Sequence, residues 1–146
     1  MRIKCQIEKP GNNDIEIVSE LLEGAGLPYE DISEHWKTFL VAKVNGKIIG
    51  AIGLEILNDK ALLRSLVVKN EFRNYGFGKE LYNRCIELAK QNNIKEIGLL
   101  TTTAEGFFAK AGFEKVHKEN IPPFIKSTKE FQVYCPSSST IMIKTI

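Results

Sequence analysis

A short alternation of apolar and polar residues and several apolar runs bounded by turns predict the strands of this chain. Residues 3–7 alternate and predict a short first strand. Three longer apolar runs follow, and the two joints between them, Asn45-Gly46 and Asn58-Asp59, have the composition of tight turns. The pattern predicts an antiparallel meander made of residues 38–44, 47–57 and 60–68.

Helical spacing replaces the alternation in three places. Residues 12–24 begin with capping residues and end at glycine, and residues 104–111 form a shorter helix that Gly112 stops. The clearest amphipathic helix is predicted over residues 78–91. Its apolar stripe consists of Leu81, Cys85, Leu88 and Ala89.

The order of the predicted elements defines the expected fold class. Three further strands are predicted at residues 95–102, 113–119 and 140–146, with an irregular crossover over residues 120–139. The order β-α-α-β-β-β-α-β-α-β-β indicates a mixed α/β sheet with helices on both faces. The chain has 146 residues and neither repeats nor a linker, so we expect a single domain over residues 1–146.

Composition narrows the possible functions. A formal net charge of +2, with no block of like charges, argues against nucleic acid as a partner. No apolar run is long enough to span a membrane, and the first residues lack the pattern of a signal peptide. The three cysteines are far apart and fit a reduced, cytoplasmic protein without a metal site.

The joint between the strand at 60–68 and the helix at 78–91 carries Arg73, Gly76 and Gly78. A Walker phosphate loop and a dinucleotide fingerprint both require residues that are missing here. Two glycines at a helix start let the backbone approach a ligand, and the exposed amides of such a start bind phosphate. The alternative is that the glycines only permit a tight turn.

The motif Arg-x-x-Gly-x-Gly at residues 73–78, in this position, resembles the signature of the GCN5-related N-acetyltransferases, the GNAT family. A second segment, Phe107, Phe108, Gly112 and Phe113, is similar to the aromatic pair and Gly-Phe of that family. The resemblance covers essentially the whole chain and is most specific over residues 62–113. It implies the GNAT fold, acetyl-CoA as cofactor and transfer of an acetyl group to an amine.

The resemblance also implies the cofactor-binding residues. The backbone of the strand before the loop would pair with the pantetheine arm, and a main-chain N–H near Val67 or Val68 would polarise the acyl carbonyl. The amides of the loop would hold the pyrophosphate, and the helix at 104–111 would line the other side. The residues concerned are Leu66, Val67, Val68, Arg73, Asn74, Tyr75, Gly76, Phe77, Gly78, Lys79, Thr102 and Phe108.

Phe108 departs from the family pattern, which often has a tyrosine there to return a proton to the leaving thiolate. Either the thiolate leaves unaided or through water, or another group supplies the proton. The candidates are Thr101, Thr102, Thr103, Tyr134 and Cys135. The missing hydroxyl also favours an alternative function, a module that binds acyl-CoA without turnover.

Glu55 and Ser65 are the candidate catalytic residues. Glu55 lies among apolar neighbours, where an inward carboxylate would have a raised pKa suited to a general base; the alternative is a solvent-facing strand position. Arg64 and Ser65 interrupt an apolar run. A buried Arg64 needs an anionic partner, either Glu55 or the carboxylate of a substrate. His35 and His117 are expected to be surface or packing residues.

Parts of the sequence resemble narrower groups within the family. Residues 99–123 are similar to the acetyltransferase part of N-acetylglutamate synthases. Residues 62–68, 99–113 and 130–144 together resemble a GNAT subgroup encoded beside arsenic-resistance genes. Both imply a small amine that bears a carboxylate, bound by Arg64. Protein N-acetylation is the further alternative, and a homodimer is a possible assembly.

Overall fold

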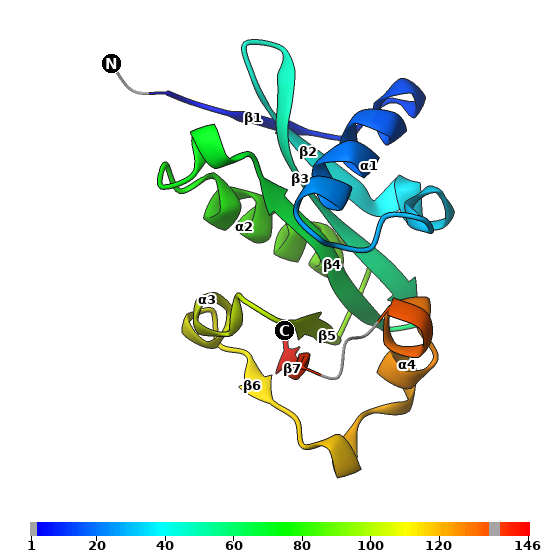
Figure 1. Cartoon of the computed structure of the whole chain (residues 1–146). Coiled ribbons are helices and arrows are strands. Elements are labelled where there is room, and N and C mark those ends of the chain that lie inside the picture. Colours follow the sequence, from blue (N-terminus) through cyan, green and yellow to red (C-terminus); the bar gives the residue numbers. More distant parts are fainter. Residues whose placement is uncertain (1–2, 135–137) are drawn as a thin grey trace.

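The computed structural model describes residues 3–134 and 138–146, which form one seven-stranded mixed sheet and the helices around it (Figure 1). The strand order is β1-β2-β3-β4-β5-β7-β6. The strands are β1 (Gln6–Glu8), β2 (Phe39–Val44), β3 (Lys47–Leu57), β4 (Lys60–Val68), β5 (Glu96–Thr101), β6 (Glu114–Lys115) and β7 (Thr140–Thr145). The helices are α1 (Ile15–Gly24), α2 (Phe77–Gln91), α3 (Glu105–Lys110) and α4 (Pro123–Lys126).

The predicted meander is confirmed. β2, β3 and β4 pair antiparallel, and the two tight turns lie at the predicted joints. Asn45 and Gly46 adopt φ values of 52° and 77°, and Asn58 adopts 61°. Such positive φ values suit asparagine and glycine, which explains why these residues mark the turns.

A bulge in β4 changes which side of the sheet its residues face. Ala51 pairs with Val67, whereas Gly53 pairs with Arg64, so β4 holds one extra residue between these pairs. Ser65 lies there with φ of 63°. Before the bulge, Leu63 packs against α2; after it, Val67 packs on the opposite face, with α1.

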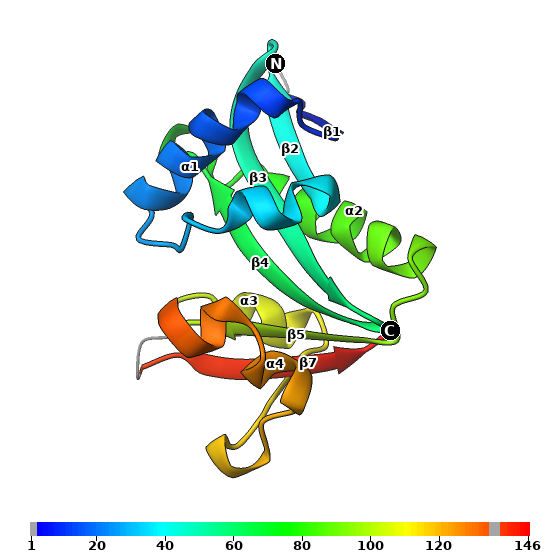
Figure 2. The same ribbon diagram turned by 90° about the vertical axis from the view of Figure 1, so that its right-hand side faces the viewer.

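β4 and β5 run parallel and stay together for only a short distance. Their paired residues are Lys60 with Glu96, Ala61 with Ile97, and Leu62 with Gly98. Beyond these pairs the two strands diverge, so that the sheet opens into a V (Figure 2). β5 then pairs with β7 along its whole length, which stabilises the lower arm of the V.

Helices cover both faces of the sheet, as predicted. α2 and α3 lie on one face, where Leu81, Cys85 and Phe108 enter the largest core cluster. α1 and the short helix η2 (Ile32–Thr38) cover the other face of β2–β4 and bury Leu22 and Ile32. α4 lies on this second side, near β5 and β7 (Figure 1).

Three predictions about local structure need correction. The first strand begins at Gln6 rather than Ile3, and the strand predicted at 113–119 pairs only over β6. The crossover predicted as irregular contains α4, the 3-10 helix η4 (Lys118–Asn120) and the π-helix η5 (Glu130–Tyr134). Two further short 3-10 helices, η1 (Asn12–Asp14) and η3 (Asn70–Phe72), precede α1 and α2.

In the part of the chain that the structure describes, no helix is both long and apolar enough to cross a membrane.

Gly53 is required by the packing of Phe39 across the β2–β3 ladder. A Cβ at position 53 would lie inside van der Waals contact with the fully buried Phe39 ring. We expect Gly53→Ala to destabilise the fold by about 1–3 kcal/mol, the usual cost of overpacking. Gly24→Ala is the matched control, because a Cβ there meets nothing within 4 Å. Urea unfolding of both variants tests this; equal stabilities would contradict the packing argument.

Candidate functional site

A cleft of about 850 Å³ lies where β4 and β5 diverge. Residues 63–68 of β4 form one wall, and residues 99–104 form the other. Because pairing ends at Leu62, the β4 edge beyond it has no strand partner on the β5 side. Extended ligands bind well to such an edge, since they can pair with its free backbone groups. The strand that the sequence assigns to the pantetheine arm therefore has a free edge on this side.

α2 begins at one end of the cleft with a tight turn at Gly76. Gly76 is the N-cap residue with φ of 82°, and the first helical hydrogen bond runs from Glu80 N to Gly76 O at 3.1 Å. The amides of Phe77, Gly78 and Lys79 consequently have no backbone acceptor among the described residues. Free amides and the partial positive charge of a helix start favour a phosphate group there.

The predicted cofactor residues divide into two groups. Eight line the cleft: Leu66, Val67, Val68, Arg73, Asn74, Gly78, Thr102 and Phe108. Four do not line it: Tyr75, Gly76, Phe77 and Lys79. The Phe77 side chain is buried in the core, and the half-exposed Tyr75 stacks on it with ring centroids 5.5 Å apart. For Phe77, only the backbone is left to contact a cofactor, so its predicted role depends on its amide.

Phe108 presents an aromatic ring to the cleft and no proton donor. Its ring meets Phe107 and Phe113 edge-on, with centroids 5.1 and 5.6 Å apart. The Thr101 hydroxyl already accepts a hydrogen bond from the Ala104 amide at 2.9 Å. Of the predicted alternative donors, Cys135 lies outside the described residues. The others, Thr101, Thr102, Thr103 and Tyr134, all line the cleft.

Arg64 is fully buried at the cleft wall and faces three carboxylates. Its Nη1 and Nη2 lie 2.8 and 2.5 Å from the two oxygens of Asp31. Nη1 is also 3.3 Å from Glu55 Oε1, and Nε is 3.2 Å from Glu130 Oε2. Of the partners that the sequence left open, Glu55 is therefore present. The predicted contact with a substrate carboxylate stays a prediction, and such a carboxylate would compete with three that the chain already supplies.

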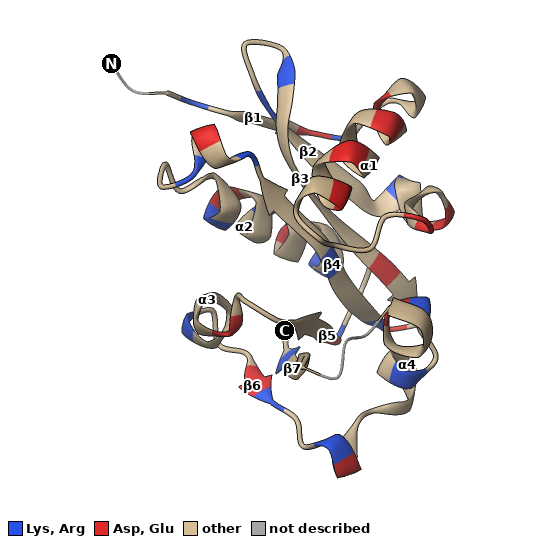
Figure 3. Ribbon diagram, in the orientation of Figure 1, with Lys and Arg blue, Asp and Glu red and all other residues tan. Residues whose placement is uncertain are grey.

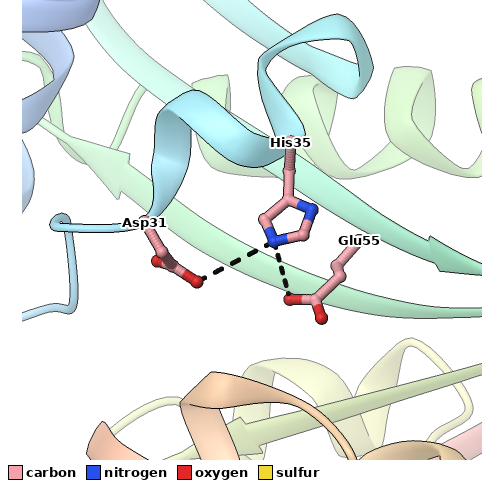
Figure 4. A group of neighbouring side chains, drawn as sticks. All are labelled: Asp31, His35 and Glu55. Carbon is pink, nitrogen blue, oxygen red and sulfur yellow. Dashed lines mark ion pairs between the residues drawn. The ribbon is translucent and has the colours of Figure 1, made fainter.

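Glu55 is 7% exposed, so the alternative of a solvent-facing position is wrong. It groups with Asp31 and His35 on the side of β3 covered by η2 (Figure 4). His35 Nε2 lies 3.3 Å from Glu55 Oε1 and 3.8 Å from Asp31 Oδ2. Glu55 does not line the cleft. Its predicted catalytic role therefore has no direct geometric support.

The same three side chains are close enough to suggest a metal ion, since their ligand atoms lie within 4.8 Å of one another. Both carboxylates, however, already contact the guanidinium of Arg64. A divalent ion would have to compete with the guanidinium for the same two oxygens, Asp31 Oδ2 and Glu55 Oε1. We interpret the group as an ion-pair network.

Comparison with known proteins identifies the family. The sequence model of the acetyltransferase (GNAT) family matches residues 12–113. The chain belongs to the GNAT family. This match confirms the resemblance of the motif at residues 73–78.

The GNAT chain is similar to curated proteins and solved structures. An uncharacterized N-acetyltransferase of Chlorobaculum tepidum is 35% identical over 64% of the chain and 60% of its own length. An amino-acid acetyltransferase of Pseudomonas aeruginosa is 29% identical over 87% of the chain but only 32% of its own length. N-acetylglutamate synthase from Neisseria gonorrhoeae, solved with coenzyme A and N-acetyl-glutamate, superposes with a TM-score of 0.83. The two proteins share 20% sequence identity, and the superposition covers 99% of this chain and 36% of the Neisseria chain. This similarity shows the fold alone.

Two acidic residues at the Arg64 cluster, Asp31 and Glu130, were not predicted from the sequence. Asp31 precedes η2, and Glu130 begins η5, which lies in the crossover predicted as irregular. The only signal for them was indirect, because a buried Arg64 demands anionic partners without saying where they lie in the chain. Ser65, predicted as catalytic, lines the cleft and accepts a hydrogen bond from Arg64 Nε at 3.1 Å; its role stays a prediction.

The balance between burial and the charge of Arg64 shifts the pKa values of Asp31 and Glu130 in opposite directions. Burial alone would raise the pKa of Asp31, but the hydrogen bonds and charge of Arg64 outweigh burial and lower that pKa. Burial raises the pKa of Glu130 to about 7, because the Arg64 charge offsets only part of the desolvation. Glu130 is therefore partly protonated at neutral pH, whereas Asp31 is ionised.

Asp31→Asn removes the bidentate partner of Arg64 while keeping the side-chain shape. We expect it to destabilise the GNAT domain by about 3–5 kcal/mol at neutral pH, the cost of leaving one member of a buried pair uncompensated. The difference from wild type should shrink in acid, because the Asp31 contribution is present above its ordinary pKa and is lost as the pH falls through its lowered pKa.

Glu34→Gln is the control for this variant. Glu34 pairs with Lys129 at 2.7 Å, but both side chains are about half exposed. Its loss should cost about 1 kcal/mol or less. Chemical unfolding as a function of pH measures both variants, and an Asp31→Asn protein as stable as Glu34→Gln would contradict the proposed network.

Proposed function

We propose that this GNAT domain transfers an acetyl group from acetyl-CoA to the amine of a small molecule, within a ternary complex. The observation that carries the proposal is the cleft between β4 and β5, with an unpaired strand edge along one wall and free helix amides at one end. The family match and the coenzyme A in the Neisseria structure support it.

Each part of the cleft has a role in this proposal. The backbone of Leu66–Val68 pairs with the pantetheine arm, and the amides of Phe77–Lys79 hold the pyrophosphate. Acetyl-CoA supplies the activated thioester. A main-chain N–H near Val67 or Val68 polarises its carbonyl, which requires no special side chain.

The charge distribution bears on the acceptor. α1 carries acidic but no basic residues (Figure 3), and Asp31, Glu55 and Glu130 outnumber Arg64 at the neighbouring cluster. Such an excess of negative charge attracts a cation, which is the form most amines take at neutral pH. The names of the Pseudomonas and Neisseria relatives support an amino-acid acceptor, and we include this class in the proposal. Arg64 then acts through its charge, since most of its N–H groups already face the chain's own acceptors.

Binding of acyl-CoA without turnover is the second candidate function. It is favoured by Phe108, which places an apolar ring where many family members have a tyrosine hydroxyl. Protein N-acetylation, the third candidate, is what the name of a Bacillus subtilis relative describes, at 25% identity over 59% of the chain.

An acceptor screen separates these candidates. The protein is incubated with acetyl-CoA and, in separate reactions, L-glutamate, L-lysine, spermidine and an alanine-initiated peptide, and free thiol is measured. We expect release well above the amine-free rate with at least one small amine. Release with the peptide alone would favour protein acetylation, and binding of acetyl-CoA without any release would favour the second candidate.

Gly76→Val and Gly78→Val test whether the start of α2 binds the pyrophosphate. Side chains there should block approach to the amides, and the loss of one or two charge-assisted hydrogen bonds predicts roughly 10- to 100-fold weaker binding of acetyl-CoA. Gly46→Val is the matched control for Gly76, since Gly46 has a similar φ of 77° in the β2–β3 turn. Calorimetric titration measures affinity; unchanged binding in both the Gly76 and the Gly78 variant would place the phosphate site elsewhere.

A further inference from the structure

Glu130 is the acidic side chain that the structure brings to the cleft from outside the predicted site. It begins η5 and lines the cleft together with Arg64 and Ser65, next to the segment of β4 assigned to the thioester. Thr128 fixes the start of η5, because its hydroxyl accepts a hydrogen bond from the Phe131 amide at 3.2 Å and donates one to Ile125 O at 2.7 Å. Glu130 therefore stands on an anchored turn.

One oxygen of Glu130 accepts no hydrogen bond from the part of the chain that the structure describes. The residue is 9% exposed, and Oε2 is buried without a donor among the described residues. Arg64 Nε lies 3.2 Å away, but its hydrogen points to Ser65 Oγ. A buried carboxylate oxygen without a donor is costly, so this atom is suited to a donor that arrives with a ligand.

Glu55, the base predicted from the sequence, occupies a different environment. Its Oε1 is shared between Arg64 Nη1 and His35 Nε2, both at 3.3 Å. It does not line the cleft, and its partners are already in place. Asp31 is likewise committed to Arg64 through both oxygens. Of the three carboxylates around Arg64, Glu130 alone reaches the cleft. Its Oε2 is ion-paired with Arg64 Nε at 3.2 Å but accepts no hydrogen bond from the described residues.

We propose that Glu130 is the general base that binds the acceptor ammonium and removes its proton, a role that rests on the proposed acetyl transfer. The ammonium N–H would donate a hydrogen bond to Glu130 Oε2, which accepts none from the described residues. Arg64 and Ser65 then act as positioning residues. Arg64 holds the Glu130 carboxylate by its charge, Ser65 accepts a hydrogen bond from Arg64, and neither touches the reacting nitrogen.

The step balances as follows. Glu130 takes one proton from R–NH₃⁺, which forms the carboxylic acid and frees the nitrogen lone pair. That pair forms the C–N bond to the acetyl carbon, and the C–S bond breaks with its electrons remaining on sulfur. The nitrogen loses its second proton to the thiolate through water or a cleft hydroxyl, and Glu130 later releases its own proton to solvent. The products are the amide, the free thiol and one proton.

The charges that face Glu130 are compatible with this role. Burial raises the pKa of Glu130, Arg64 from β4 lowers it, and the negative charges of Asp31 and Glu55 raise it further, so that the pKa lies at about 7. A base with a pKa close to the working pH is efficient, because it is often unprotonated and still binds a proton well. Activity should consequently rise with pH through neutrality.

Glu130→Gln tests the catalytic role with an uncharged side chain of the same shape. With an amine from the screen (L-glutamate, L-lysine or spermidine), we expect kcat to fall about 100-fold or more. The rising limb of the pH profile near neutrality should disappear, while the affinity for acetyl-CoA stays unchanged. Glu55→Gln should keep that limb whatever its rate, and Glu34→Gln is the surface control.

A second measurement needs no turnover. Since the folded-state pKa of Glu130 is raised, its contribution to stability is present below the ordinary pKa of 4.5 and lost as the pH rises through about 7. The melting temperature of Glu130→Gln minus that of wild type should therefore increase from pH 5 to pH 8. A constant difference would show that Glu130 is already ionised at pH 5 and would overturn the inference.

The outcomes separate the two proposals. If the wild type releases thiol and Glu130→Gln does so at the same rate and with the same pH profile, only the role of Glu130 is overturned, and acetyl transfer stands. Absence of release by wild type with every amine tested overturns acetyl transfer and, with it, this role. A lost rising limb together with the pH-dependent melting difference supports both proposals.

Discussion

The architecture depends on one feature of the sheet, the short pairing between β4 and β5. Three residue pairs hold these strands together, and the pairing is not resumed beyond Leu62. The bulge at Ser65 lies just past this point and turns the following residues to the opposite face. A free strand edge, a cleft and a helix start at the end of that cleft all follow from this parting, because β4 leads directly into the loop before α2.

A second constraint holds the cleft wall together, the burial of a single guanidinium among three carboxylates. Arg64 joins β4 to β3 through Glu55, to the turn before η2 through Asp31, and to η5 through Glu130. A buried ion pair adds little net stability compared with apolar packing, but loss of one partner is costly. The network therefore fixes the relative positions of four segments, of which the turn before η2 and η5 are distant in sequence from the β3–β4 hairpin. One guanidinium cannot neutralise three acids, so the acceptor end keeps an excess of negative charge, which protonation of Glu130 reduces but does not remove.

Most of the fold could be predicted from the sequence because local signals specify it. Turn residues at 45–46 and 58–59 fixed the limits of β3 and β4, and the apolar stripe of α2 was read correctly. The glycines at 76 and 78 marked the helix start, because the N-cap residue Gly76 has a φ of 82°, a conformation that glycine adopts readily. η5 was missed, since a single π-helical turn has no periodicity of its own. Asp31 and Glu130 were missed because their contact with Arg64 depends on tertiary packing.

The two ends of the cleft differ in how they would bind their ligands, and this explains what the sequence reveals. Main-chain groups serve the cofactor end, so the required pattern is short, local and shared across the family. Side chains from β3, β4, the turn before η2 and η5 build the acceptor end, and no motif connects them. The family match stops at residue 113, before Glu130. With Glu130 as the proposed base, acceptor chemistry would rest partly on a segment beyond the family match, separate from the loop before α2.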